Sequence, residues 1–468
     1  MILKNNASEA EFLKEIENKK LYCFGAGRVF QDFLMVHKDI HIYSVIDRNA
    51  DILKEKYKNI SFIKPDEFIC ECDDKNSVLL ITCFDFEKIQ SELRNEKSLN
   101  NLPCYVYFIM QEFNGIEQIN EQNNRYQLTE FRYQDCMAGQ KAPADVAVIA
   151  SKLGYSVLTL NRGTLASGME QTEQSWKRIA DGLKENSILI LQLPLADDTE
   201  GIYKILTMKK EKKVKIIGII HDVNILRGNP TDYDFRQYKV LKELPDVLIV
   251  HNKYMMKELY HKGFDINKMV NLEIFDYLMP SHRQIQISDG IVIAGNLMKS
   301  KAAYVYQINK IQGISFNLFG ANYIDKNSYS NINYFGAFLP DDLINNLQGK
   351  YGLVWDGDSI ETCSGGKGEY LRINNPHKLS LYLAVGIPVI IWDEAAEAEF
   401  VIKEHVGITV KSLYDLPDKL EAVSDSEYEN MKHNAEAVGE KLRRGEYMTN
   451  AIRRAENLIK GRETNAGV

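Results

Sequence analysis

With 468 residues, the chain is too long for one ordinary hydrophobic core, and its length predicts about three domains. Hydrophobic residues make up 45% and charged residues 26% of the composition, which is typical of a globular protein and argues against disorder. The net charge of −8 argues against a general nucleic-acid-binding protein, which would usually be basic.

The N-terminal stretch and the cysteines indicate a cytosolic protein. The stretch MILKNNASEAEFLKE lacks the apolar core of a signal peptide, and no apolar run of about 18 residues could span a membrane. Seven scattered cysteines are typical of reduced thiols. Cys70 and Cys72 are too closely spaced for a usual zinc site. We expect no metal, and a cytoplasmic protein with at most peripheral contact with the inner face of the membrane.

The first predicted domain covers residues 1–128. Continuous apolar runs that alternate with polar helical stretches predict a parallel sheet covered on both faces, as in a small Rossmann-like domain. The strands are expected at 21–27, 42–47, 60–64, 77–84 and 105–110. The polar segment 114–128, rich in Asn and Gln, is interpreted as a linker.

A glycine pair in this domain resembles a dinucleotide-binding fingerprint. Gly25 and Gly27 end the first strand, and Asp47 follows at the end of the next one. However, Phe30 occupies the third glycine position, and no catalytic Tyr-x-x-x-Lys set is present. Nucleotide binding and a structural or assembly role therefore both stay open.

Two further α/β domains are expected, at 129–285 and 286–468. In the first of them, strands are predicted near 131–133 and at 156–160, 187–193, 214–220, 246–251 and 270–275, with a helix that Pro143 and Asp145 open and that ends near Leu153. In the second, strands are predicted at 291–297, 316–320, 352–357, 387–392 and 408–410. Two such domains in tandem place the carboxyl ends of both sheets at one cleft, where ligands bind.

The C-terminal stretch 427–461 is basic and predicted to be helical. It could contact anionic lipid. Its modest apolar positions favour the alternative that it packs back across the two domains.

A short helix after residue 375 carries a cation in an unusual place. Asn375 is expected to be its N-cap, Pro376 its first residue, and Gly386 its left-handed end. His377 and Lys378 fall in the first turn, where the helix dipole disfavours a cation by up to about 1 kcal/mol. A bound phosphate would reverse that preference. The alternative is a solvated lysine that tolerates its position.

Two other loops also favour an anion-binding site. Asn296 and Lys299 belong to the segment AGNLMKSK (294–301) at the end of a strand, and the glycine-rich loop 364–370 carries another lysine. All three loops are expected at the same end of one sheet.

Several segments in this order resemble a known bacterial family. They are AGQKAPADV (138–146), IIHDVNILR (219–227), VHNKYMMKELYHKGF (250–264), LEIFDYL (272–278) and NNPHKLSLYLAVGIPVII (374–391). They resemble the GT-B glucosyltransferases and β-1,6-galactofuranosyltransferases that build adhesin glycans and cell-surface polysaccharides. The resemblance spans roughly residues 131–460.

The resemblance implies a GT-B fold and a UDP-sugar donor held mainly by the last domain, without metal or other cofactor. The donor-binding residues that it implies are Gly295, Asn296, Lys299, Tyr370, Asn375, His377, Lys378 and Ser380. Lys378 and Lys299 would contact the diphosphate, and Tyr370 would lie near the base or ribose. Many GT-B enzymes carry a ribose-binding glutamate where this chain has Leu381, so ribose is expected to be held by Ser380 or by backbone.

Inversion at an anomeric carbon requires a base for the attacking hydroxyl and charge stabilisation on the leaving UDP. Asp222 is our first candidate for the base and His221 the second, because both follow the buried strand at 214–220. The alternatives are a helix N-cap for Asp222 and a hydrogen-bonded core histidine for His221. Asp276 is a more remote candidate for the base.

Gly139, Lys141 and Arg227 are expected on the acceptor side of the cleft. A plain turn around Lys141 and a surface salt bridge for Arg227 are the alternatives. The sequence thus predicts an inverting, metal-independent glycosyltransferase that moves galactofuranose or glucose from a UDP-sugar to a glycan or lipid-linked acceptor. The resemblance also implies a homo-oligomer. A non-catalytic nucleotide-sugar-binding partner and an NAD-dependent sugar-modifying enzyme are the rival functions.

Overall fold

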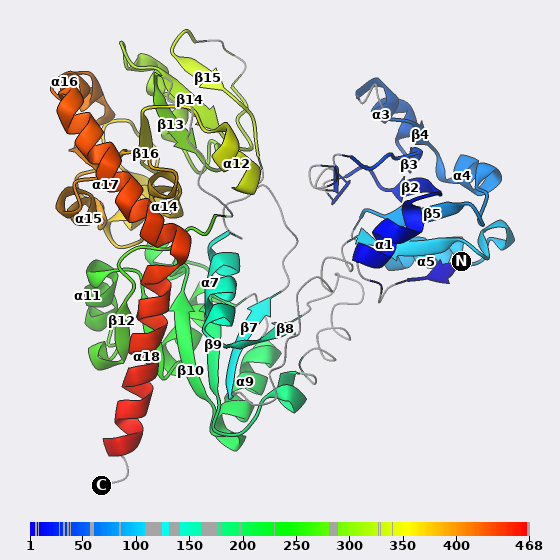
Figure 1. The fold of residues 1–468 in the computed structure, drawn as a ribbon, viewed down its shortest axis with the longest axis horizontal. Coiled ribbons are helices and arrows are strands. Elements are labelled where there is room, and N and C mark those ends of the chain that lie inside the picture. Colours follow the sequence, from blue (N-terminus) through cyan, green and yellow to red (C-terminus); the bar gives the residue numbers. More distant parts are fainter. Residues whose placement is uncertain are drawn as a thin grey trace. The chain divides into compact units, whose positions relative to one another are not determined.

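The computed structural model forms two compact units, and Figure 1 shows the ribbon. It describes residues 1–468 except 5–6, 8, 28, 31–32, 35–36, 38, 57–59, 84–85, 108–123, 131–140, 161–175, 177–178, 196–198, 229, 280–288, 326, 328, 339 and 466–468. The first unit contains Met1–Ile119, Glu130–Asp135 and Leu158–Gly182, and the second contains Asn120–Thr129, Cys136–Val157 and Leu183–Val468.

The first unit carries a six-stranded sheet in the order β1-β6-β5-β2-β3-β4, with parallel pairing between neighbours. The strands are β1 (Ile2–Leu3), β2 (Lys20–Phe24), β3 (Ser44–Ile46), β4 (Phe62–Ile63), β5 (Ser77–Ile81) and β6 (Pro103–Val106). The helices are α1 (Glu9–Ile16), α3 (Ala50–Lys56), α4 (Pro65–Glu71), α5 (Phe86–Leu93) and the 3₁₀ turn η1 (Lys97–Leu99). The predicted Rossmann-like sheet is confirmed, although the two-residue strand β1 was not predicted.

Alternation along the strands explains why both faces of this sheet are covered. Leu21 and Cys23 of β2 pack into one apolar cluster, whereas Tyr22 and Phe24 pack into another. Successive side chains of a strand point to opposite faces, so the two clusters lie on the two sides of the sheet.

The second unit carries two sheets, and we call their domains the central domain and the C-terminal domain. The central sheet has the order β12-β11-β10-β9-β7-β8. Its strands are β7 (Arg125–Glu130), β8 (Ser156–Leu160), β9 (Ile188–Leu193), β10 (Lys215–Ile220), β11 (Val247–Val250) and β12 (Met269–Asn271). Its helices are α7 (Lys141–Lys152), α9 (Thr199–Glu211), η3 (Asn224–Arg227), α10 (Asp232–Glu243), α11 (Lys253–His261) and η4 (Ile266–Lys268).

Two sequence expectations about the central domain need correction. The segment 114–128 is not all linker, because β7 begins at Arg125 and pairs in parallel with β9. Helix α7 begins at Lys141, ahead of the expected start at Pro143. The strand expected near 131–133 lies outside the described residues.

The C-terminal sheet has the order β15-β14-β13-β16-β17-β18. Its strands are β13 (Ile291–Ala294), β14 (Phe316–Phe319), β15 (Ile332–Tyr334), β16 (Tyr351–Val354), β17 (Val389–Trp392) and β18 (Gly407–Val410). The helices between them are η5 (Ala303–Tyr306), η6 (Ile308–Lys310), α12 (Pro340–Asn346), α13 (Gly365–Glu369), η7 (Tyr370–Arg372), α14 (His377–Ala384), α15 (Ala398–Lys403), η8 (Leu413–Asp415) and α16 (Leu416–Glu421). The predicted strands are confirmed, and only the exposed edge strand β15 is an addition.

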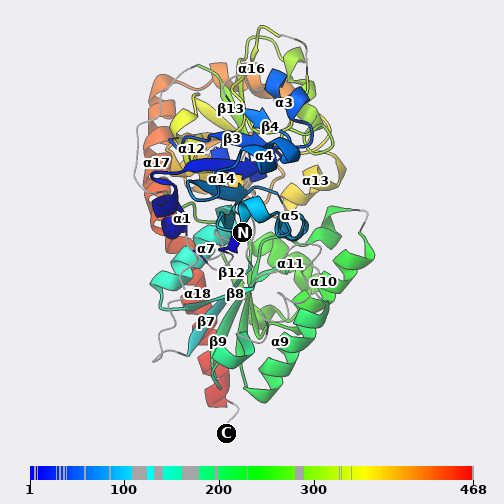
Figure 2. The same ribbon diagram turned by 90° about the vertical axis from the view of Figure 1, so that its right-hand side faces the viewer.

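Two long helices, α17 (Asp425–Arg444) and α18 (Glu446–Asn465), connect the domains of the second unit. Helix α17 packs on α14 of the C-terminal domain, whereas α18 packs on α7, β11 and β12 of the central domain (Figures 1 and 2). Gly445 joins them at a φ of +75°, and a Cβ there would lie 2.7 Å from Cγ1 of Ile149. A side chain is disfavoured at this joint for both reasons.

The prediction that the C-terminal stretch packs back is therefore confirmed. The apolar side chains Met448, Ile452 and Ile459 of α18 belong to the buried core of the central domain. The face that could have entered a lipid surface is covered by protein. Within the part of the chain that the structure describes, no helix is both long and apolar enough to cross a membrane.

Candidate functional site

A cavity of about 410 Å³ lies between the central and C-terminal domains. From the central domain it is lined by Lys141, Ala142, Pro143, His221, Asp222, Arg227, Phe275 and Tyr277. From the C-terminal domain the lining includes Gly295, Asn296, Lys301, Asp356, Lys367, Tyr370, Asn374, Asn375, His377, Lys378 and Leu381. The residues after β10 and after β13 both contribute, so the cavity lies at the carboxyl ends of parallel strands, as predicted.

Asn375 joins the two domains rather than capping α14. The N-cap position belongs to Pro376, and no side chain caps the helix there. The Asn375 side-chain amide donates to the carbonyl oxygens of His251 at 2.7 Å and Glu273 at 3.0 Å, and its oxygen accepts from Asn252 at 2.6 Å. The N-cap prediction is therefore wrong, because all polar atoms of this side chain bind the central domain. Gly386 follows the helix at a φ of +76°, as predicted.

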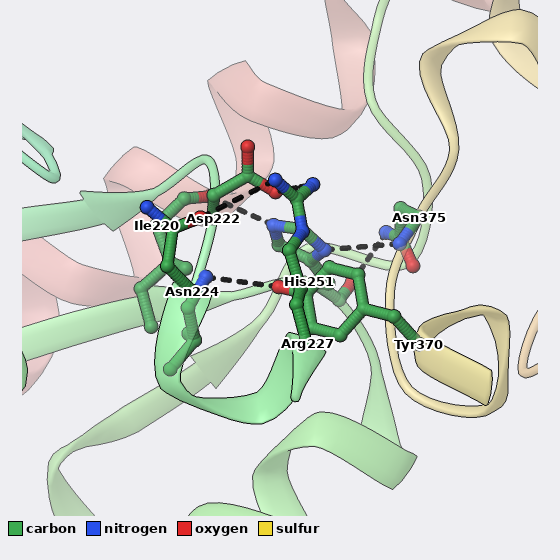
Figure 3. Close-up of polar contacts among 8 residues, drawn as sticks. Ile220, Asp222, Asn224, Arg227, His251, Tyr370 and Asn375 are labelled. Atoms are coloured by element: carbon green, nitrogen blue, oxygen red, sulfur yellow. Dashed lines mark hydrogen bonds and ion pairs between the residues drawn. The ribbon is translucent and has the colours of Figure 1, made fainter. Parts of the chain in front are cut away.

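His251 completes this contact in a neutral form. Its Nε2 lies 3.0 Å from the carbonyl oxygen of Ile220, and its Nδ1 accepts from the backbone N–H of Asn375 at 2.9 Å (Figure 3). A carbonyl accepts only, so Nε2 carries the proton. Complete burial lowers the pKa of His251 to about 3, which keeps the ring neutral.

Lys378 lies in the cavity wall and is paired. Its Nζ donates to the carbonyl oxygen of Trp355 and to Oδ1 of Asp356, each at 2.8 Å, and only 18% of its side chain is exposed. The alternative of a solvated lysine is therefore wrong. Fixing the amine to the end of β16 holds one positive charge at the start of α14.

The second lysine of the cavity wall is not Lys299. Lys299 is exposed, its Nζ lies 5.9 Å from the ring centroid of Tyr306, and it is not among the described residues that line the cavity. Lys301 lines the cavity instead. The loop after β13 thus supplies a cation, but two residues later than the resemblance implied, while Gly295 and Asn296 do line the cavity.

The glycine-rich loop supplies a further cation. Lys367 of α13 donates to the carbonyl oxygen of Ser300 at 3.0 Å and lines the cavity. Burial lowers its pKa, and the nearby charges of Lys301 and Arg227 lower it further. Positive charges are therefore crowded here, and a bound anion would relieve their repulsion. We call Arg227, Lys301, Lys367 and Lys378 the cation cluster.

Arg227 and Tyr370 meet across the domain boundary. The guanidinium carbon of Arg227 lies 4.7 Å from the ring centroid of Tyr370 (Figure 3). The Tyr370 hydroxyl accepts from the backbone N–H of Val223 at 2.9 Å. Arg227 also donates to the Asp222 carboxylate and, at 3.3 Å, to Oδ1 of Asn224. The expected salt bridge is thus present, with 36% of the Arg227 side chain exposed. Nε of Arg227 is buried and has no hydrogen-bond partner among the described residues.

Asp222 faces the cavity from the end of β10. It is not a helix N-cap, since Val223 holds that position for η3. The surrounding protein removes water from the carboxylate and raises its pKa, while the charges of Arg227 and Lys301 act in the opposite direction. A carboxylate of raised pKa that is held next to a cation cluster has the chemistry of a general base.

His221, the next residue in the wall, has a fixed orientation. Its ring stacks on Phe275 with centroids 5.5 Å apart, and its Nε2 lies 2.7 Å from Oε1 of Gln192. The Gln192 amide nitrogen donates to the carbonyl oxygen of Pro143 at 3.1 Å, so its oxygen must face His221. Nε2 therefore carries the proton, and the lone pair of the neutral ring is on Nδ1.

Three other predicted residues are placed as follows. Ser380 is buried and donates to the carbonyl oxygen of Phe275 at 2.6 Å. It is not among the described cavity residues, so the expectation that it holds ribose is corrected. Lys141 lines the cavity from the start of α7 rather than from a plain turn, with Nζ 2.5 Å from Oδ1 of Asp145 and 2.7 Å from the carbonyl oxygen of Leu278. Gly139 lies outside the described residues.

Asp276, the remote candidate for the base, has a structural partner instead. Its carboxylate accepts from the backbone N–H groups of Met448 at 2.6 Å and Tyr447 at 3.3 Å. These groups belong to the first turn of α18, where a carboxylate is favoured. Asp276 thus anchors α18 and is not among the described cavity residues.

In the first unit, the structure brings the fingerprint residues together. The carboxylate of Asp47 accepts from the backbone N–H of Ala26, between Gly25 and Gly27, at 3.0 Å, and from that of Asn49 at 2.9 Å. The acidic residue thus closes the glycine loop. Nucleotide binding by this loop stays a prediction. Among the described residues, no group of three or more His, Cys, Asp or Glu side chains is arranged to hold a metal.

Comparisons with known proteins match the second unit. The glucosyltransferase 3-like N-terminal domain matches residues 125–274, and the glucosyltransferase 3-like C-terminal domain matches residues 291–455. Beta-1,6-galactofuranosyltransferase WbbI of Escherichia coli strain K12 is 33% identical over 346 residues, which cover 72% of this chain and 100% of that protein. Glucosyltransferase 3 of Streptococcus gordonii is 28% identical over 63% of this chain and 88% of its own length. The structure of Anabaena HepE with UDP-glucose has a TM-score of 0.48 at 9% identity, over 72% of this chain and 99% of that one.

Proposed function

Because this chain belongs to the glucosyltransferase 3-like family of glycosyltransferases, we propose that it transfers galactofuranose or glucose from a UDP-sugar to a glycan or lipid-linked acceptor in cell-surface polysaccharide assembly. The enzyme class follows from the family. The donor, the acceptor and the stereochemical course are proposals, and so are the roles of individual residues.

The cation cluster is the observation that carries this proposal. Arg227, Lys301, Lys367 and Lys378 reach one cavity from four separate segments. Asp222 and Asp356 pair with Arg227 and Lys378, and Lys367 donates to a backbone carbonyl. A UDP-sugar brings a diphosphate, and basic side chains beside the start of a helix are the groups that bind one.

We further propose that the reaction does not require a divalent cation. As the sugar leaves, negative charge grows on the UDP oxygen, and fixed cations aimed at that position stabilise it without reorganisation. The cation cluster offers this stabilisation directly. The proposal predicts that turnover continues in excess EDTA, and a strict requirement for Mg²⁺ or Mn²⁺ would contradict it.

For the chemical step, we propose Asp222 as the base. The acceptor hydroxyl oxygen attacks the anomeric carbon, its proton passes to Asp222, and the bond to the UDP oxygen breaks with its electron pair on UDP. A diphosphate would compete with Asp222 for Arg227. Donor binding would thereby loosen the ion pair and leave the carboxylate more basic. His221 is the alternative base, through Nδ1.

The roles of the individual domains are part of the same proposal. We assign the acceptor to the central domain, starting where β7 begins, and the donor to the C-terminal domain up to α17 and α18. The residues N-terminal to β7 would form an accessory domain. We also propose a cytoplasmic homo-oligomer at the inner face of the membrane, for which cell fractionation and light scattering of the full chain are the tests.

The decisive experiment uses the purified full chain with UDP-glucose and UDP-galactofuranose in the presence of EDTA. UDP release that depends on an acceptor saccharide is expected with one of the two donors, and NMR of the product should show inversion at the anomeric carbon. The absence of UDP release with both donors, or a product of retained configuration, would overturn the corresponding part of the proposal.

A further inference from the structure

His377 lines the cavity and carries one buried polar atom that has no hydrogen-bond partner among the described residues. The residue belongs to the first turn of α14, is partly buried and lines the cavity. Within the described part of the chain, its Nε2 has no hydrogen-bond partner. Leaving a buried polar atom unpaired costs free energy, so such an atom in a residue that lines a cavity calls for an explanation.

The other ring nitrogen defines the tautomer. His377 makes a hydrogen bond to the backbone of Asp276, and this bond raises the pKa of the ring. A bond that favours the protonated ring must be donated by the ring, so the backbone group is the carbonyl oxygen. Since Nε2 has no partner, the bond comes from Nδ1, which must carry the proton. The lone pair of the neutral ring is then on Nε2, so this atom can only accept a hydrogen bond.

The surroundings keep the ring neutral. Burial lowers the pKa of His377 to about 4, and the charge of Lys141 acts in the same direction. Nε2 of this cavity-lining residue is thus an uncharged acceptor at physiological pH. A phosphate oxygen, which has no proton to donate, is therefore not its natural partner, whereas a hydroxyl group is.

The ring is held on the side of the central domain. Its centroid lies 5.1 Å from that of Tyr277 and 6.2 Å from that of Phe275, both of which follow β12. The next residue, Lys378, belongs to the cation cluster. His377 therefore lies between the proposed diphosphate position and the domain proposed to hold the acceptor, which is where a transferred sugar would be.

We propose that Nε2 of His377 accepts a hydrogen bond from a hydroxyl group of the hexose that is transferred, and that it thereby helps to select the sugar. This inference rests on the proposed UDP-sugar donor. The uracil ring also carries an N–H donor, so the experiment must separate the sugar from the nucleotide.

Two substitutions separate the two ring nitrogens. In His377→Asn, the amide reaches roughly the position of Nδ1 and can keep the bond to Asp276, but it has no atom at Nε2. In His377→Gln, the longer amide can place its oxygen near the position of Nε2. His261→Asn, at an exposed position at the end of α11, is the matched control.

Calorimetric titrations of the full chain with UDP and with UDP-glucose or UDP-galactofuranose, whichever the unmodified protein binds, test the proposal. We expect UDP affinity to stay within about twofold in all variants. The UDP-hexose affinity should fall about 5–10-fold in His377→Asn, as for loss of one neutral hydrogen bond, and recover in part in His377→Gln. We also expect one monodeoxy analogue of the donor to bind the unmodified protein weakly, because it lacks the hydroxyl group that His377 contacts. Its affinity should equal that of the parent donor for His377→Asn.

Each contrary outcome has its own meaning. Equal weakening of UDP and UDP-hexose would place the contact on the nucleotide and overturn the proposal. Unchanged binding in His377→Asn, or full affinity for every monodeoxy analogue, would also overturn it, and the analogues decide even where a variant fails to fold. If the unmodified protein binds neither UDP nor UDP-hexose, the proposed function itself fails.

Discussion

Arg227 lies over the ring of Tyr370, with its guanidinium carbon 4.7 Å from the ring centroid, although the two residues belong to different domains. The same arginine holds the Asp222 carboxylate. One side chain thus connects the domain contact, the candidate base and the cation cluster. Its removal should therefore affect both catalysis and the relation between the domains.

Arg227→Lys should lower kcat/KM at least ~10-fold, although it keeps the charge. A lysine lacks the planar fork that binds Asp222 and Asn224 together and that covers the Tyr370 ring. Steady-state kinetics with the donor varied would measure the loss. Arg453→Lys, at an exposed position on α18, is the control and should behave like the unmodified enzyme. Equal activity of the two variants would show that the fork has no role.

Lys378→Met should lower turnover at least ~100-fold, because it removes a charge contact to the leaving diphosphate. The methionine keeps most of the apolar stem, so the packing of α14 is largely preserved. Lys403→Met is the matched control, since 71% of the Lys403 side chain is exposed. Near-normal turnover of Lys378→Met would remove this residue from the proposed donor site.

The sequence predicted most strands of the three sheets and the position of His221 and Asp222, because these depend on local patterns. Continuous apolar runs identify buried parallel strands, and polar residues directly after them fall at the ligand-binding edge. The edge strand β15 was missed because its INY sequence is short and exposed. Strand β7 was missed because the segment that leads into it is polar.

The site residues that the sequence placed wrongly depend on distant partners. Nothing near Asn375 indicates that its amide binds His251, which precedes it by 124 positions. Loops have no periodicity, so the pattern AGNLMKSK could not decide between Lys299 and Lys301. The position of Ser380 was likewise determined by the carbonyl of Phe275, a residue of the other domain.

Asp222→Asn should lower kcat at least ~100-fold, as expected for loss of a general base. The affinity for UDP should be kept or rise, because the carboxylate that competes for Arg227 is removed. Gln192→Leu is the informative companion, because it removes the acceptor that fixes the His221 tautomer without touching Asp222. If Asp222 is the base, Gln192→Leu should retain most of the turnover. A large loss in Gln192→Leu together with a small loss in Asp222→Asn would reassign the base to His221.

Asp276 should make the stability of the second unit depend on pH. Burial is the main reason why the pKa of its carboxyl is raised to about 7, and the negative charges of Asp145 and Glu446 raise this pKa further. The hydrogen bonds from the amides of Met448 and Tyr447 lower it. An unfolded aspartate has a pKa of about 3.9. Between these values the folded state binds the proton more tightly, so this contribution is fully present below about pH 4 and is lost as pH rises through about 7. The difference of about three pKa units corresponds to roughly 4 kcal/mol.

Asp276→Asn should abolish this dependence of stability on pH. Its amide oxygen still accepts a hydrogen bond from the first turn of α18, but the side chain cannot ionise. Relative to the unmodified protein, the variant should unfold at a higher temperature at pH 8.5 and lose that advantage at pH 5. Thermal unfolding of both proteins at the two pH values measures this difference in midpoint. Asp418→Asn, at an exposed position on α16, provides the control, since its effect on the midpoint should be the same at both pH values. A parallel shift of Asp276→Asn at both pH values would mean that the carboxyl of Asp276 does not titrate in this range.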